Sequence, residues 1–264
     1  MPSSPARNVA EGPLKVWLER EGALLRLRLA RPKANLIDAA MIAALAAAFA
    51  AHRDNAGLLA ALVDHEGPHF SFGASVEEHL PERCAEMLAA LHALIGRMLD
   101  WPRPILVCAR GQCLGGGLEF AAAGHLLFLS PDAQLGQPEI KLGVFAPAAS
   151  VLLPLRIGQA RAEDLLVSGR SIDAQTALGW GLANEVADDP AAAAAAYFDK
   201  HLSGRSGAAL ALAVRAVREP FSELARARLD DVEALYVEKL MTTRDANEGL
   251  TAFLEKRAPR WEHR

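Results

Sequence analysis

The chain has 264 residues and a formal net charge of −4 at pH 7, and 52% of its residues are hydrophobic against 23% charged. This composition is typical of a folded globular protein. It excludes a disordered chain, which would need fewer apolar residues, and a coiled coil, which would need sustained heptads. The charges are mixed along the chain with no long Lys/Arg run, so nucleic acid is not expected as a partner.

The sequence has the features expected of a cytoplasmic protein. Residues 1–13 contain no apolar segment of the signal-peptide type, and we expect them to form a flexible N-terminal extension. The longest uncharged runs are too short to cross a bilayer. The three cysteines, Cys84, Cys108 and Cys113, show neither metal-binding nor disulfide-type spacing, and we expect them to be reduced thiols. We therefore predict a protein without a membrane anchor or a bound metal.

The first half of the chain alternates strand and helix patterns. The alternation of Leu and Arg over residues 15–29 predicts a β-hairpin with one solvent-facing side. Asp38 is placed to cap an Ala-rich helix that runs to about residue 52. The remaining patterns before residue 130 predict, in chain order, a buried strand at 58–63, an amphipathic helix at 84–99, a strand at 105–109, a helix at 118–123 and a strand at 126–129.

Helix patterns dominate the second half of the chain. One strand is expected at 182–186, among helices predicted at 161–167, 174–179, 190–202, 208–219, 222–241 and 243–256. A strand-rich part followed by a helical part predicts one α/β core over residues 14–200 with a helical region over residues 201–264. No Ser/Gly linker separates the two parts.

Two motifs match known catalytic patterns only superficially. Residues 65–69 spell the zinc-binding pattern H-E-x-x-H, but this pattern works on a helix, and Gly67-Pro68 prevents that helix. Ser75 lies in a G-x-S-x-E sequence, which lacks the second glycine of a nucleophile elbow. Neither a zinc hydrolase nor an α/β-hydrolase is therefore expected.

A glycine cluster, Gly115–Gly117, lies between the strand predicted at 105–109 and the helix predicted at 118–123. It has neither the spacing of a dinucleotide-binding loop nor the Lys-Ser/Thr of a Walker loop, so we do not expect it to bind phosphate. Two interpretations stay open. The glycines permit close packing at a turn, or they leave N–H groups free at a helix N-terminus to bind an anion.

Two carboxylates lie where burial is expected. Glu119 follows the glycine cluster in the first turn of an apolar helix, and Glu139 lies in a Gln-Pro-Glu loop between apolar segments. A buried Glu with no adjacent Lys or Arg is costly unless it is protonated, hydrogen-bonded or acting on a substrate. Each could be a structural acid, but a pair beside a candidate anion site resembles general acid/base machinery.

Taken together, five separated motifs resemble the enoyl-CoA hydratase/isomerase family, the crotonases, from about residue 14 to residue 261. The motifs are Arg31–Asn35, Phe70–Ala74, Leu114–Glu119, Gly136–Glu139 and Phe253–Arg257. The resemblance implies an α/β fold, the crotonase-like spiral of ββα units, with a C-terminal helical trimerisation region. It also implies a homotrimer or a dimer of trimers.

By the same resemblance, the backbone N–H groups of Ala74 and Gly116 form an oxyanion hole for the carbonyl of an acyl-CoA thioester. Two fixed donors would stabilise the negative charge that addition builds on this oxygen. The resemblance assigns the acid/base work to Glu119 and Glu139, and we expect Glu139 to give the proton and Glu119 to activate water. Coenzyme A is then part of the substrate, and no separate cofactor is implied.

Further contacts with the acyl-CoA are implied by the resemblance. Lys33 and Ala34 are expected near the nucleotide, and Lys256 and Arg257 of a neighbouring subunit near the phosphates, although the lysines are equally compatible with ordinary surface charges. The other residues expected to bind substrate are Phe72, Gly73, Ser75, Val76, Gly115 and Phe145.

Departures from the family pattern narrow the expected substrate. Both acids are present, which favours hydration over isomerisation. Phe145–Ser150 replaces the usual glycine-rich stretch, and Ser75 replaces the usual Asp, so a remodelled pocket that suits a flat or cyclic acyl group is expected. Residues 68–79, 111–119 and 137–150 most resemble the cyclohexa-1,5-diene-1-carbonyl-CoA hydratases, which form 6-hydroxycyclohex-1-ene-1-carbonyl-CoA in anaerobic benzoyl-CoA degradation.

Two alternatives remain. The first is a short-chain enoyl-CoA hydratase or an enoyl-CoA isomerase of the same family. The second is a non-catalytic crotonase scaffold that binds RNA or protein. A scaffold of this kind would favour a lysine-studded helix, and residues 38–52 contain no Lys or Arg.

Overall fold

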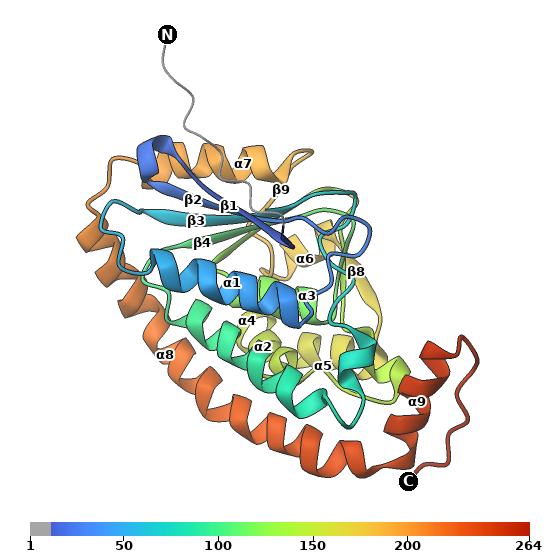
Figure 1. The fold of residues 1–264 in the computed structure, drawn as a ribbon. Coiled ribbons are helices and arrows are strands. Elements are labelled where there is room, and N and C mark those ends of the chain that lie inside the picture. The colour runs from blue at the N-terminus through green and yellow to red at the C-terminus, as the bar shows by residue number, and fades with distance from the viewer. Residues whose placement is uncertain (1–11) are drawn as a thin grey trace.

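The computed structural model describes residues 12–264, and the prediction made for residues 1–11 lies outside the described part of the chain. Its centre is a six-stranded sheet in which the first two strands are antiparallel and the others are parallel (Figure 1). In sheet order the strands are β1 (Leu14–Glu19), β2 (Leu24–Leu29), β3 (Ala60–His65), β4 (Ile105–Ala109), β6 (Leu126–Leu129) and β9 (Glu185–Val186).

A second, smaller sheet lies beside the first. It consists of β5 (Gln112–Leu114), β7 (Gln134–Gly136) and β8 (Ser171–Asp173), in this order. β5 follows β4 after a turn of two residues, and β7 pairs with β5 in parallel. The chain thus passes repeatedly from the large sheet to the small one, as the predicted spiral of ββα units requires.

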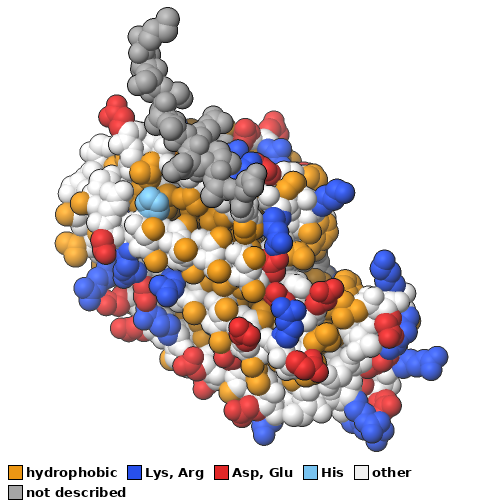
Figure 2. Space-filling view, in the orientation of Figure 1, with side chains coloured by type: hydrophobic (Ala, Val, Ile, Leu, Met, Phe, Trp, Pro, Cys, Tyr) orange, Lys and Arg blue, Asp and Glu red, His pale blue; other side chains and the backbone are white. Residues whose placement is uncertain are grey.

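Helices cover both faces of the large sheet. α7 (Pro190–Tyr197) lies on one face, and α1 (Ala39–His52), α2 (Cys84–Leu99) and α3 (Gly116–Ala123) lie on the other side (Figure 1). Alternate residues of β4 face the two layers: Leu106 packs with α7, whereas Val107 packs in the larger core with α1, α2 and α3. The surface over α1 and α2 is rich in hydrophobic side chains (Figure 2).

The second half of the chain is mostly helical, as predicted. From residue 147 on, its helical elements besides α7 are α4 (Pro147–Ile157), α5 (Gln159–Ser168), α6 (Ala174–Gly179), the π-helical turn η4 (Phe198–Leu202), α8 (Gly207–Ala234), the π-helical turn η5 (Leu235–Lys239), the 3-10 turn η6 (Leu240–Thr242) and α9 (Arg244–Leu254). α8 runs along the outside of α2 and α4. α9, which follows it in the chain, lies at the opposite end of the molecule from α7 (Figure 1). The division at residue 200 stays a prediction.

Several predicted elements are confirmed at their bounds. Asp38 caps α1 by accepting a hydrogen bond from the N–H of Met41 at 2.9 Å. α2, β4, β6 and α6 begin and end where the sequence pattern predicts. The hairpin is also confirmed, with Leu14 opposite Leu29 and the 3-10 turn η1 (Arg20–Gly22) between its strands.

The predicted solvent-facing side of this hairpin is wrong in one respect. Arg26 is only 7% exposed, because β3 places Asp64 beside it on the same face of the sheet. Arg26 donates to Asp64 at 2.9 Å and to Glu19 at 3.0 Å, and Arg28 donates to Asp64 as well. A cross-strand ion-pair network therefore covers the polar side of the strands.

Other bounds shift. The strand predicted at 58–63 lies at 60–65, the helix predicted at 118–123 begins at Gly116, and the strand predicted at 182–186 shortens to two residues. The helices predicted at 208–219 and 222–241 are wrong as separate units, since α8 continues through Pro220. Packing of Ala225 and Leu229 against the core outweighs the one hydrogen bond that Pro220 removes. Helix α4 and the strands of the small sheet were not predicted.

The segment with the H-E-x-x-H spelling is not helical. His65 ends β3, and Gly67 has a left-handed φ of +80°. The rings of His65 and His69 instead accept hydrogen bonds from the N–H groups of Arg110 and Gln112, at 3.3 Å and 3.1 Å. Both histidines therefore fix the loop that follows β3 against the loop that leads into β5.

The three cysteines are buried, unpaired thiols. Among residues 12–264, no helix is long and apolar enough to span a bilayer. The same residues contain no group of three or more His, Cys, Asp or Glu side chains arranged to hold a metal ion.

Candidate active site

The loop after β3 pairs with β5 and so reaches the start of α3. The N–H of Ser71 donates to the carbonyl of Gln112, and the N–H of Leu114 donates to the carbonyl of Ser71, both at 3.0 Å. Three residues beyond Ser71, Ala74 lies against Gly116, the first residue of α3. A Cβ atom placed on Gly116 would be 3.1 Å from the backbone nitrogen of Ala74. The close packing predicted for the glycine cluster is therefore present, and it brings two N–H groups together; binding of an anion by them stays a prediction.

The N–H groups of Ala74 and Gly116 donate no hydrogen bond within residues 12–264. Gly116 is the first residue of α3, where helical N–H groups lack an acceptor and carry partial positive charge. Gly73 makes the approach possible, since it has φ +104° and a Cβ there would lie 3.1 Å from the carbonyl oxygen of Leu114. Two free donors are thus held side by side, the geometry that an oxyanion hole needs.

Glu119 is buried on α3, with 4% of its surface exposed. Its Oε1 accepts a hydrogen bond from the N–H of Ala149 at 2.9 Å. Ala149 is the third residue of α4, so the positive end of this helix faces the carboxylate. Burial raises the pKa of Glu119, and the hydrogen bond from Ala149 and the charge of His92 partly oppose that rise. The segment expected to remodel the acyl pocket therefore also holds a candidate catalytic acid.

Glu139 approaches from the 3-10 turn η3 (Pro138–Leu142). Its Oε1 lies against Gly115, where a Cβ would be only 2.4 Å away. The buried amide of Gln137, in the orientation that its hydrogen bonds favour, donates to both carboxylate oxygens at 3.2 Å and 3.0 Å. Burial, followed by the negative charge of Glu119, raises the pKa of Glu139 to about 8. Glu139 is consequently protonated at neutral pH, as a general acid must be.

A small cavity of about 60 Å³ opens beside these groups. It brings together predicted site residues from three separate segments with apolar side chains that the sequence did not single out. Its lining consists of Phe72, Gly73, Ala74, Val76, His79, Gly115, Pro138, Glu139, Leu142, Val144 and Leu250. Of the residues missed, His79 lies in the 3-10 turn η2 (Val76–His79), at the end of the segment 68–79 that resembles the family, whereas Leu250 comes from α9 and had no signal in the sequence.

α9 folds over the site of its own chain, against η2 and η3. Gly249 permits this contact, because a Cβ on Gly249 would lie 2.0 Å from the carbonyl oxygen of Leu142. The C-terminal region thus closes the acyl cavity in addition to forming an outer layer of the fold.

Some of the other predicted binding residues lie beside the loop that follows β3, and the rest lie away from the cavity. Ala34 accepts a hydrogen bond from the N–H of Phe72 at 3.0 Å, so the exposed Lys33 lies beside the oxyanion-hole loop. Ser75 begins η2 and accepts from the ring of His79 at 2.8 Å. Lys256 and Arg257 lie past the end of α9 and do not line the cavity.

Arg257 pairs with Glu248 and Glu255 of its own chain, at 2.5 Å and 2.6 Å. Phe145 also lies outside the lining of the cavity. Its ring packs edge-on against Tyr236, with 5.3 Å between the ring centroids. Contact of these residues with an acyl-CoA stays a prediction.

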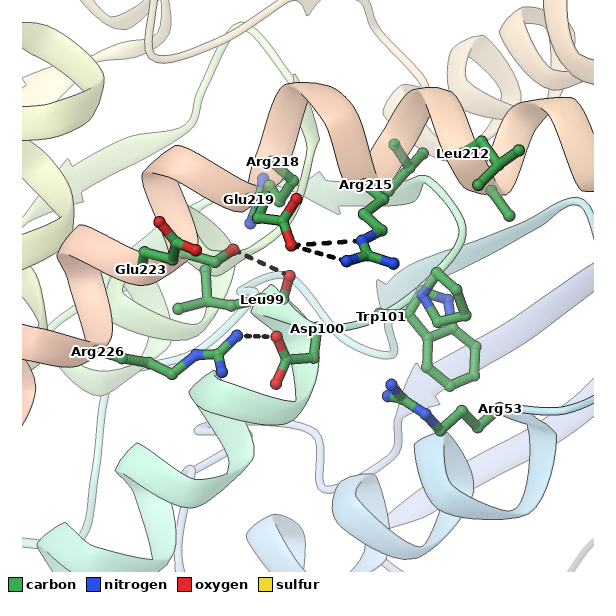
Figure 3. Close-up of a pocket in the computed structure, with 14 residues that line it drawn as sticks. Arg53, Leu99, Asp100, Trp101, Leu212, Arg215, Arg218, Glu219, Glu223 and Arg226 are labelled. Atoms are coloured by element: carbon green, nitrogen blue, oxygen red, sulfur yellow. Dashed lines mark hydrogen bonds and ion pairs between the residues drawn. The ribbon is translucent and has the colours of Figure 1, made fainter.

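A larger cavity of about 470 Å³ lies elsewhere, between α2 and α8 (Figure 3). Half of the residues that line it are charged, and four of these form the ion pairs Arg215–Glu219 and Arg226–Asp100. No predicted site residue lines this cavity. Size alone therefore does not locate the site, which is marked by the free N–H pair and the two acids.

Comparison with known proteins agrees with this geometry. Residues 19–264 match the family described as Enoyl-CoA hydratase/isomerase. The chain belongs to the enoyl-CoA hydratase/isomerase family. It is 62% identical over 255 residues, 97% of this chain and 99% of the relative, to the cyclohexa-1,5-dienecarbonyl-CoA hydratase of Thauera aromatica. It is 30% identical to the carnitinyl-CoA dehydratase of Proteus mirabilis, over 94% of this chain and 98% of the relative.

The fold of this family member also matches solved structures. The crystal structure of an enoyl-CoA hydratase/isomerase from Pseudoalteromonas atlantica superimposes with a TM-score of 0.81 at 27% identity, covering 94% of this chain and 99% of that chain. The crotonase-type fold that the motifs predicted is thereby confirmed.

Proposed function

We propose that this protein is a hydratase that adds water to cyclohexa-1,5-diene-1-carbonyl-CoA and forms 6-hydroxycyclohex-1-ene-1-carbonyl-CoA, a step of anaerobic benzoyl-CoA degradation. The observation that carries this proposal is the 62% identity over 97% of the chain with the Thauera aromatica hydratase. The site supports it, because Glu139 lies against Gly115 beside the free N–H pair, and Glu119 lies in the same first turn of α3 as Gly116.

Addition begins at the thioester. Its carbonyl oxygen accepts hydrogen bonds from the N–H groups of Ala74 and Gly116, and water attacks the β-carbon of the ring while Glu119 takes a proton from it. The electron pair of the attacked double bond moves onto the carbonyl oxygen and gives a dienolate. Fixed donors at the N-terminus of α3 stabilise this negative charge without reorganising.

Protonation completes the reaction at the far carbon of the dienolate. Glu139, protonated at neutral pH because its pKa is about 8, gives its proton to that carbon, and the carbonyl and a ring double bond form again. In a six-membered ring the two reacting carbons lie across from each other, so two acids on one side of the ring serve both. Transfer of the proton from Glu119 to Glu139 then restores the starting state.

Binding of coenzyme A and assembly complete the proposal. Lys33 and Ala34 contact the nucleotide, and Lys256 and Arg257 of a neighbouring subunit contact the phosphates of a homotrimer or dimer of trimers. Exposed apolar side chains on α8 support such an assembly, since Leu212 is 68% exposed and Val217 82% exposed in the single chain. The buried cysteine thiols and the acyl-CoA substrate support a cytoplasmic location, and no metal or separate cofactor takes part.

Steady-state assays with two substrates test the proposed activity. We expect kcat/KM for cyclohexa-1,5-diene-1-carbonyl-CoA to exceed that for crotonyl-CoA, with 6-hydroxycyclohex-1-ene-1-carbonyl-CoA as the product. A higher kcat/KM for crotonyl-CoA would instead make the protein a short-chain enoyl-CoA hydratase. Migration of a double bond without uptake of water would make it an isomerase.

A further inference from the structure

Tyr236 carries a buried hydroxyl that no group in the described part of the chain satisfies. The residue is 0% exposed, and its hydroxyl has no hydrogen-bond partner within residues 12–264. Most buried polar groups in native proteins are paired, and leaving a hydroxyl unpaired costs free energy of folding. Tyr236 lies in the π-helical turn η5, a type of turn found frequently at functional sites. The orphan hydroxyl therefore needs a functional explanation.

The position of Tyr236 connects it to the acyl cavity. It belongs to one apolar cluster with Val144 and Leu250, and Ala74, Val76 and Leu142 pack against the same cluster; all five line the cavity. Its ring centroid is 6.5 Å from that of His79, another lining residue. The ring thus lies directly behind the wall that faces the acyl group.

The hydroxyl remains a donor under all relevant conditions. Burial, followed by the charges of Cys84, Glu139 and Glu119, raises the pKa of Tyr236, so the phenol keeps its proton. It hydrogen-bonds neither acid in the free protein. A neutral O–H donor behind the lining of the cavity is therefore available to an oxygen atom that arrives with the reactants.

With the proposed substrate, one oxygen atom remains that could accept a hydrogen bond from this hydroxyl. Its ring is a hydrocarbon, and the thioester carbonyl is held by Ala74 and Gly116. The remaining oxygen near the ring is that of the water which becomes the hydroxyl of the product. Building on the proposed function, we infer that Tyr236 is a further catalytic residue, whose hydroxyl donates a hydrogen bond to the reacting water and then to the product hydroxyl. Tyr236 keeps its own proton, while the proton lost by water goes to Glu119.

The variant Tyr236→Phe removes the donor and retains the ring. We expect kcat with the cyclic dienoyl-CoA to fall about tenfold or more while KM changes less than about threefold, because the lost contact strengthens in the transition state. The matched control is Tyr197→Phe. Tyr197, the other tyrosine of the chain, is the last residue of α7 and packs against Phe128, on the opposite face of the sheet, and this variant should leave both constants unchanged.

Stability separates a catalytic role from a structural one. Since Tyr236→Phe removes an unpaired buried hydroxyl, urea unfolding should find the variant as stable as the parent protein or more stable. A clear loss of stability, or kcat within twofold of the parent value, would overturn the inference.

Ligand affinity gives a second readout, measured in a Glu139→Gln background to prevent turnover. The additional Tyr236→Phe change should weaken binding of 6-hydroxycyclohex-1-ene-1-carbonyl-CoA and leave binding of cyclohex-1-ene-1-carbonyl-CoA, which has no hydroxyl, unchanged. Equal effects on the two ligands would contradict the inference. If the parent enzyme prefers crotonyl-CoA, the proposed substrate fails, and the comparison is made with 3-hydroxybutyryl-CoA and butyryl-CoA. A selective loss for 3-hydroxybutyryl-CoA would then retain the role of Tyr236.

Discussion

The carboxylate of Glu139 lies directly against the α-carbon of Gly115, so that a Cβ on Gly115 would be 2.4 Å from Oε1. This contact joins η3 to the start of α3 and places the candidate acid one residue before Gly116, whose N–H is the proposed oxyanion-hole donor. The absence of a side chain at Gly115 therefore determines how close the carboxylate of Glu139 comes to this N–H group.

Substitution of Gly115 by Ala should consequently disable the site. The new methyl group would displace the carboxylate of Glu139, and the φ of +51° at this position is unfavourable for Ala. We expect kcat to fall by about a hundredfold, as for loss of a general acid. Gly96→Ala is the matched control, because Gly96 lies within α2 with no atom near its Cβ position. Equal turnover of the two variants would show that Glu139 need not lie where it does.

Glu139→Gln tests the acid directly. We expect turnover to fall at least about a hundredfold with little change in the affinity for a CoA thioester, because only the transferable proton is lost. Glu86→Gln, an exposed change on α2, serves as the control and should behave like the parent enzyme. Near-normal turnover of Glu139→Gln would remove this residue from the mechanism.

The parent enzyme should also lose activity at high pH. Because burial and the charge of Glu119 raise the pKa of Glu139 to about 8, we expect kcat/KM to decline as pH rises through about 8, where the proton needed for transfer is lost. The apparent value belongs to the pair of acids and not to one of them. A profile that stays flat between pH 7 and about pH 9 would argue against a carboxylic acid as the donor.

The same raised pKa predicts a pH-dependent stability. The unfolded chain releases the proton of Glu139 near pH 4.5 and the folded chain near pH 8, so ionisation favours the unfolded state increasingly as pH rises between these values. Glu139→Gln has no such cost. Urea unfolding should therefore show the variant to be more stable than the parent protein at pH 8, with a smaller difference at pH 5. A difference that does not vary with pH would contradict this assignment.

Arg218 stabilises the opposite end of α3. Its guanidinium, 9% exposed, donates to the carbonyl of Ala123 and, at 3.1 Å, to that of Gly124. Arg218→Met should cost about 1–3 kcal/mol of unfolding free energy, because a buried carbonyl loses its donor. Arg215→Met changes a side chain that is 71% exposed and pairs with Glu219 (Figure 3), and should change stability by less than about 0.5 kcal/mol. Similar values for the two variants would show that this end of the helix needs no side-chain donor.

Local patterns were sufficient wherever an element is long and its neighbours in sequence decide its structure. The periodicity of α2 and the cap at Asp38 predicted helices that the structure confirms. The three-residue strands of the small sheet are too short to show a period. α8 was predicted as two helices because Pro220 is locally unfavourable, and tertiary packing reversed that preference.

For the candidate site, the segments that form it could be predicted from the sequence: the glycine cluster, the two carboxylates and the motifs that mark the family. Their arrangement was not. The bond from Ala149 to Glu119 spans 30 residues, Leu250 enters the cavity from α9, and Tyr236 reaches its wall from the end of α8. Periodicity and spacing report on neighbours along the chain, whereas burial, pKa and the approach of distant groups arise only when the helices and sheets pack together.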